Sequence, residues 1–114
     1  MKKETMVTEF ETHIKSEKSG FSKWYVGITD DIVRGLFNEH NVSMYDDWWI
    51  YRIADSKDDA GKIEMHFINM GCQGAPGGGD EDSIFVYAYL ITNSTAQCTM
   101  CNEIRRVKRK PINS

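Results

Sequence analysis

The chain has 114 residues, of which 40% are hydrophobic and 27% are charged, proportions typical of one globular domain with a modest core. No apolar run approaches the roughly 20 residues of a membrane-spanning helix, so no membrane partner is expected. The first residues, MKKETMVTEFETHI, are charged where a secretory signal is apolar, which predicts a cytoplasmic protein.

The net charge of −3 is unevenly distributed. The last eleven residues, IRRVKRKPINS, contain five basic side chains and no acidic one, whereas the rest of the chain is strongly acidic. The basic cluster either holds phosphate or is a solvated tail, and the acidic remainder disfavours nucleic acid unless a groove or a metal ion offsets its charge. We expect an N-terminal helix over residues 1–20, an α/β domain over 21–93 and a basic, flexible tail over 94–114.

Three cysteines cannot all pair within one chain, which argues against a secreted fold held by disulfides. Cys98 and Cys101 form a single C-x-x-C motif, and Cys72 lies far from them in the sequence. Because a structural zinc site needs about four ligands, we expect free thiols, with a zinc-binding tail as the weaker alternative.

Helix and strand patterns alternate in the first part of the chain. Residues 4–18 have apolar-face residues at helical spacing, and a serine and a glycine end this helix. Residues 23–28, KWYVGI, are aromatic and β-branched, which predicts a strand. Thr29 or Asp30 then caps a helix of about ten residues that ends near Asn41.

Arg34 and His40 lie on different faces of this second predicted helix. Counting about 100° per residue from Ile32, His40 falls in the middle of the apolar face and Arg34 lies far from it. One interpretation is a core or helix-end histidine and a solvated arginine. The other is that both residues line a site.

The second half of the chain predicts strand, helix and strand. WWIYRIA, residues 48–54, has bulky residues on both faces, as a central strand does. Ser56 and Asp59 are typical of a capping box, and the next helix runs to about Met70. Residues 84–92, IFVYAYLIT, predict the third strand. This order predicts an α/β fold, with a small three-stranded central sheet flanked by helices.

A carboxylate borders the buried stripe of the third predicted helix. The stripe follows the i, i+3, i+7, i+10 spacing: Ala60, Ile63, Phe67 and Met70. Glu64 lies at its edge, where a carboxylate is costly unless it is paired or binds a cation. It either reaches water at the helix margin or binds Mg²⁺, which proteins hold with one or two carboxylates plus substrate phosphates.

The glycine-rich stretch PGGGD, residues 76–80, allows close approach of the backbone to a ligand and is compatible with an anion-binding nest. It lacks the G-K-[ST] ending of a P-loop and does not follow a strand, which excludes that nucleotide-binding motif. The simpler interpretation is a flexible loop before the last strand.

Two segments resemble one family of nucleases. WYVGITDDIVRGLFNEH, residues 24–40, resembles the second half of the GIY-YIG signature, in which a Tyr-Ile-Gly strand precedes a helix with an arginine and often a histidine. DDAGKIEMHFINMG, residues 58–71, is similar to that family's later helix, whose glutamate binds the metal. The resemblance covers roughly residues 23–90. It implies a small domain with a three-stranded sheet that hydrolyses DNA phosphodiesters with one divalent cation, as a phage or mobile-element endonuclease.

The resemblance also implies roles for individual residues. Tyr25 and Gly27 match the tyrosine and glycine of the Tyr-Ile-Gly strand, and Glu64 matches the glutamate that binds Mg²⁺. His40 is similar to the histidine at the end of the arginine helix, which positions or deprotonates water. The bound cation offsets charge on the scissile phosphate.

The chain departs from the family pattern at three points, the first being that His40 falls one residue later than the family's histidine. Arg34, which would stabilise the charge of the transition state, lies one residue before the family's arginine position, and Gly35 occupies that position. No Gly-Ile-Tyr stretch precedes Tyr25, so the family's first strand and its catalytic tyrosine have no counterpart upstream. Asp80 loosely matches a polar residue that comes after the metal helix.

The alternative function is a catalytically inactive GIY-YIG-like module that binds protein or nucleic acid.

Overall fold

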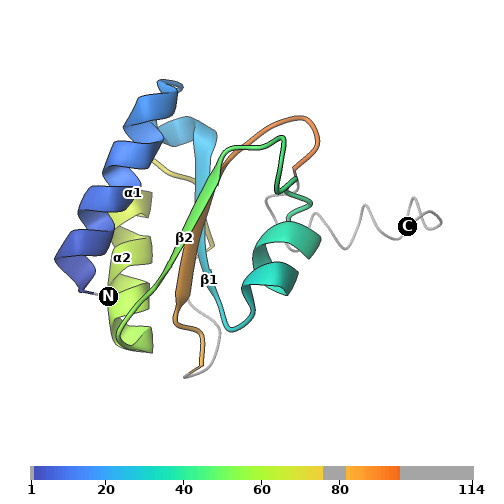
Figure 1. Ribbon diagram of the computed structural model, residues 1–114. Coiled ribbons are helices and arrows are strands. Elements are labelled where there is room, and N and C mark those ends of the chain that lie inside the picture. Colours follow the sequence, from blue (N-terminus) through green and yellow to red (C-terminus); the bar gives the residue numbers. More distant parts are fainter. Residues whose placement is uncertain (1, 76–81, 96–114) are drawn as a thin grey trace.

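The computed structural model describes residues 2–75 and 82–95. Its sheet has three antiparallel strands: β1 (Trp24–Thr29), β2 (Trp49–Ile53) and β3 (Phe85–Leu90). Two helices, α1 (Lys3–Glu17) and α2 (Lys57–Asn69), lie on one face, and the π-helical segment η2 (Val33–Asn38) lies on the other (Figure 1). A 3₁₀ turn, η1 (Phe21–Lys23), leads into β1. The predicted α/β class, a small three-stranded sheet with helices beside it, is confirmed.

The strand order is β1-β3-β2, so the last strand of the sequence is the central one. The prediction that residues 48–54 form a central strand was therefore wrong, because β2 is an edge strand. Its bulky residues do not reflect burial on both faces, since Trp48 and Ile53 remain 44% and 46% exposed at its ends. Pairing between distant segments decides which strand is central, and a local pattern does not contain that information.

The main core lies between the sheet and the two helices. Trp24, Val26, Val86 and Ala88 point towards the helices and pack against Met6, Phe10 and Ile14 of α1 and Ala60, Ile63 and Phe67 of α2. Each fully buried large side chain contributes about 1.5–3 kcal/mol to folding. The predicted stripe of the third helix is confirmed except at Met70, which caps the end of α2 and is 37% exposed. None of the helices within the described ranges is both long and apolar enough to cross a bilayer.

Local signals explain where α2 begins and how the chain leaves it. The side chain of Ser56 accepts a hydrogen bond from the Asp59 amide nitrogen at 3.1 Å, as the capping-box pattern predicts. After α2, Gly71 has a φ of +119°, which only glycine adopts readily. The chain then turns back to β1, and Val26 donates a main-chain hydrogen bond to Gln73 at 2.9 Å.

The segment after β1 differs from the predicted ten-residue helix. Only Val33–Asn38 is helical, and it is a π-helical turn, in which Glu39 donates to the Arg34 carbonyl at 2.8 Å across five residues. A π turn has more residues per turn than an α-helix, so the predicted angular positions do not apply. The buried side of η2 includes Gly35, whose added Cβ would lie 2.7 Å from the Thr29 Cβ.

Several predictions fall on residues 76–81 and 96–114, which lie outside the described residues. These are the PGGGD stretch with Asp80, the Cys98–Cys101 pair and most of the basic tail. The third cysteine, Cys72, is a buried free thiol, and burial raises its pKa to about 12. At neutral pH it is therefore a protonated core side chain rather than a nucleophile.

Candidate active site

Tyrosines from two neighbouring strands gather on the sheet face that η2 covers. Side chains alternate between the faces of a strand, so Tyr25, Gly27 and Thr29 of β1 share this face. The register pairs Tyr25 with Tyr89 and Gly27 with Tyr87 of β3. The rings of Tyr25 and Tyr89 stack with centroids 5.4 Å apart, and both side chains are buried.

Gly27 makes room for the Tyr87 side chain. A Cβ built on Gly27 would overlap the Tyr87 hydroxyl and lie 2.6 Å from the ring carbon that carries it. The tyrosine side chain thus crosses β1 above the glycine. The glycine of the Tyr-Val-Gly strand is needed for this close contact.

His40 joins the two tyrosines of β3. Its Nε2 lies 2.8 Å from the Tyr87 hydroxyl and its Nδ1 lies 2.9 Å from the Tyr89 hydroxyl. The histidine is 4% exposed, and its ring centroid lies 4.8 Å from that of Tyr25. A neutral imidazole donates from one ring nitrogen and accepts at the other. The arrangement therefore links the two hydroxyls through one proton-exchanging ring, which we call the Tyr–His cluster (Tyr25, His40, Tyr87 and Tyr89).

The pKa of Tyr87 is raised by the groups around it. Burial raises its pKa well above the ordinary value, and Tyr25, Glu39 and Glu64 raise it further, in that order. The hydroxyl is therefore protonated at neutral pH.

Glu64 is a buried carboxylate on α2. Its side chain is 3% exposed. Burial raises its pKa to about 7, and the positive charge of Lys57 offsets only part of this. At neutral pH the group is close to half ionised, and a cation would stabilise its charged form.

Arg34 lies at the exposed margin of the site. Its guanidinium pairs with Asp30 and lies 3.5 Å from Glu39, while the side chain remains 50% exposed. The Asp30 carboxylate raises the pKa of Arg34. Glu39 also contributes to the raised pKa of Tyr87. Arg34 is thus half-exposed, which agrees with the solvated interpretation and leaves its predicted role in a site a proposal.

The structure brings some of the predicted site residues together and leaves others apart. Tyr25 and His40 are direct neighbours, whereas Glu64 is on the opposite side of the sheet and Arg34 bonds to acidic groups at the margin. In the described part of the chain, no three His, Cys, Asp or Glu side chains gather into a metal cage. Glu64 would thus hold a cation as a single protein carboxylate, which fits Mg²⁺ bound jointly with substrate phosphates.

Sequence reasoning missed the second strand of the site. Local pattern identifies Tyr87 and Tyr89 only as members of a strand, although a spacing of two places both on one face. His40 was correctly placed among apolar residues, but its tyrosine partners lie 47 and 49 residues away in sequence. That pairing depends on β3 lying beside β1. Comparisons of the chain with protein-family models, with curated proteins and with solved structures found no match.

Proposed function

We propose that the protein is a Mg²⁺-dependent endonuclease that hydrolyses DNA phosphodiester bonds, as its resemblance to the GIY-YIG family implies. The observation that supports this most is the Tyr87 hydroxyl, which lies 2.8 Å from Nε2 of His40. In the family pattern, the catalytic tyrosine lies on a strand that precedes the Tyr-Ile-Gly strand, which corresponds to the strand of Tyr25 here. In this proposal β3, which comes later in sequence but lies beside β1, supplies that tyrosine.

The proposed step uses proton transfer within the Tyr–His cluster. An attacking water loses a proton to the Tyr87 oxygen while Tyr87 passes its own proton to Nε2 of His40. The water oxygen bonds to phosphorus, and the ester oxygen leaves with the bonding electrons and takes a proton from solvent. His40 can accept at Nε2 only when Nδ1 carries the proton, so Tyr89 then accepts a hydrogen bond from Nδ1.

In this proposal Glu64 and Arg34 supply charge to the same step, with Glu64 acting from α2 on the other side of the sheet (Figure 1). Glu64 is the residue that would hold Mg²⁺, which when bound neutralises charge on the scissile phosphate. Its burial, which raises the cost of an ionised carboxylate unless a cation is near, supports that role. Arg34 faces solvent, and an incoming phosphate would compete with Asp30 and Glu39 for its guanidinium.

The alternative is a non-catalytic binding module, and one observation favours it. Arg34 already contacts two carboxylates, so its charge is offset where a phosphate would approach. In that case the Tyr–His cluster is a buried polar core rather than a reaction centre. The two functions differ in whether partner binding leads to turnover.

Cleavage of supercoiled plasmid DNA with and without Mg²⁺ separates the two. We expect nicking that needs Mg²⁺, that falls by at least about 100-fold in Glu64→Ala, and that is unchanged in Asp58→Ala. Asp58 is a matched control because it is an exposed carboxylate on the same helix. Robust cutting by Glu64→Ala would contradict the assignment of Glu64. DNA binding that is equal in both variants, without turnover, would support the binding module.

A further inference from the structure

Among residues 2–75 and 82–95, the outer edge of β2 carries main-chain groups that pair with no other strand. At one end of β2 the Trp48 carbonyl accepts a main-chain hydrogen bond from the β3 side of the sheet at 3.0 Å. At the other end the Ala54 amide donates one to that side at 2.8 Å. In an antiparallel ladder, alternate residues direct both main-chain groups to the same side. Trp49 and Tyr51 therefore direct theirs away from β3. We call this side of the strand the β2 edge (Trp49–Ile53).

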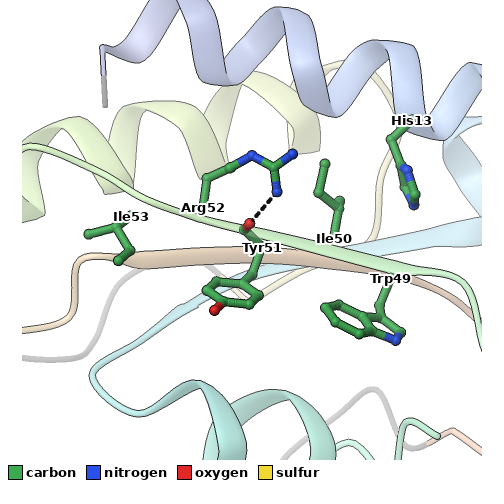
Figure 2. A pocket seen from close by; sticks show the side chains of 6 residues that line it. All are labelled: His13, Trp49, Ile50, Tyr51, Arg52 and Ile53. Carbon is green, nitrogen blue, oxygen red and sulfur yellow. Dashed lines mark hydrogen bonds between the residues drawn. The ribbon is translucent and has the colours of Figure 1, made fainter. Parts of the chain in front are cut away.

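A pocket of about 640 Å³ surrounds the β2 edge, lined by His13, Trp49, Ile50, Tyr51, Arg52 and Ile53. Figure 2 shows the rings of Trp49 and Tyr51 on one side of the strand and Ile50 and Arg52 on the other. The Tyr51 carbonyl accepts a hydrogen bond from Arg52 at 2.7 Å. Within the described ranges, the amide nitrogens of Trp49 and Tyr51 have no acceptor. Such an edge is suited to an added strand.

We propose that the β2 edge pairs antiparallel with the β2 edge of a second copy of this chain, about a two-fold axis at Ile50. In this register, Trp49 lies opposite Tyr51 of the second copy, and each of the two pairs exchanges both main-chain hydrogen bonds. The interface uses the same surface on both copies. It joins two three-stranded sheets into one six-stranded sheet.

The side chains fit this register. The aromatic rings of Trp49 and Tyr51 meet across the interface, a favourable cross-strand pair. Arg52 lies opposite Trp48 of the second copy, an indole that is 44% exposed in the single chain, and the guanidinium can stack on it. When an amide of the second copy donates to the Tyr51 carbonyl, it replaces the Arg52 guanidinium there. His13, which also lines the pocket, moves away likewise.

Charge complementarity selects a second copy and this register. Asp46 and Asp47 precede β2, and Arg52 lies near its other end. The Arg52 guanidinium bonds to Glu9 at 2.6 Å in the single chain. Antiparallel pairing brings Arg52 of each copy towards the two aspartates of the other, which then share the guanidinium with Glu9, and this contact occurs twice. An axis at Tyr51 would instead set Asp47 opposite Asp55, and an axis at Arg52 would set two guanidinium groups face to face.

Sedimentation of the full chain at increasing concentration tests the proposal. We expect a mass of twice 13.1 kDa at high concentration. Ile53 lies opposite Asp47 in this register and is 46% exposed, so a charge there should not disturb folding. Ile53→Glu should raise the dimer dissociation constant by at least about tenfold relative to Ile53→Lys, because only lysine attracts Asp47. Equal effects of the two substitutions would contradict the register.

Tyr51→Pro tests the hydrogen-bonding edge itself. Proline is tolerated on an edge strand where its missing N–H faces outward, and it blocks strand addition there. We expect this variant to retain the wild-type circular dichroism spectrum and to sediment as a monomer. A dimer that persists in folded Tyr51→Pro would place the interface elsewhere. A wild-type chain that stays monomeric up to millimolar concentration would overturn the proposal, and so would one that binds only unrelated peptides.

Discussion

Glu64 shows how one buried carboxylate links folding to the proposed chemistry. Burial raises its pKa from 4.5 to about 7, so the folded chain binds a proton at this site more tightly than the unfolded chain does. This difference in proton binding stabilises the folded state fully below pH 4.5. The stabilisation is lost as the pH rises through about 7. Ionised Glu64, the form that the proposed cation binding requires, is therefore the form that destabilises the fold.

Replacing Glu64 with glutamine should stabilise the protein at high pH. At pH 8.5 we expect Glu64→Gln to raise the free energy of unfolding by up to about 3 kcal/mol, because the amide has no charge to bury. At pH 4.5 the variant and the wild type should be nearly equal. Urea denaturation at both pH values measures this, with Glu4→Gln, an exposed substitution on α1, as the control. A difference that does not depend on pH would contradict the account.

At the scale of single elements, η2 shows what the sequence can and cannot predict. The strand, the turn and the buried His40 follow from local pattern, and so does the capped start of α2. The π-helical turn does not, because it arises where Gly35 packs against Thr29 of β1. The glycine at the position of the family's arginine therefore has a structural reason that a helical wheel does not show.

Replacing glycine with alanine should change the stability of the protein in opposite directions at two positions in helical segments. A Cβ at Gly35 would lie 2.7 Å from the Thr29 Cβ, whereas a Cβ at Gly61 of α2 meets nothing within 4 Å. We expect Gly35→Ala to destabilise the protein by about 1–3 kcal/mol through overpacking. Gly61→Ala should stabilise it by about 0.5–1 kcal/mol through helix propensity. Chemical denaturation of the two variants checks both, and a stabilising Gly35→Ala would show that the contact with Thr29 is not tight.

For the molecule as a whole, the strand order determines which residues form the site. Because β3 lies between β1 and β2, it places Tyr87 and Tyr89 beside Tyr25 and under His40. The sequence alone predicts the elements and the apolar helical stripes, since both depend on local periodicity. It does not predict that the last strand is central, so it could not place the tyrosines of β3 at the site.

The most direct test of the account is the rate of Mg²⁺-dependent plasmid cleavage by Tyr87→Phe compared with Tyr51→Phe. Both substitutions remove one tyrosine hydroxyl from the sheet, but only Tyr87 contacts His40. The account predicts that Tyr87→Phe lowers the cleavage rate by at least about 100-fold, while Tyr51→Phe stays within about threefold of wild type. Equal rates in the two variants would contradict a role for the Tyr87 hydroxyl in catalysis.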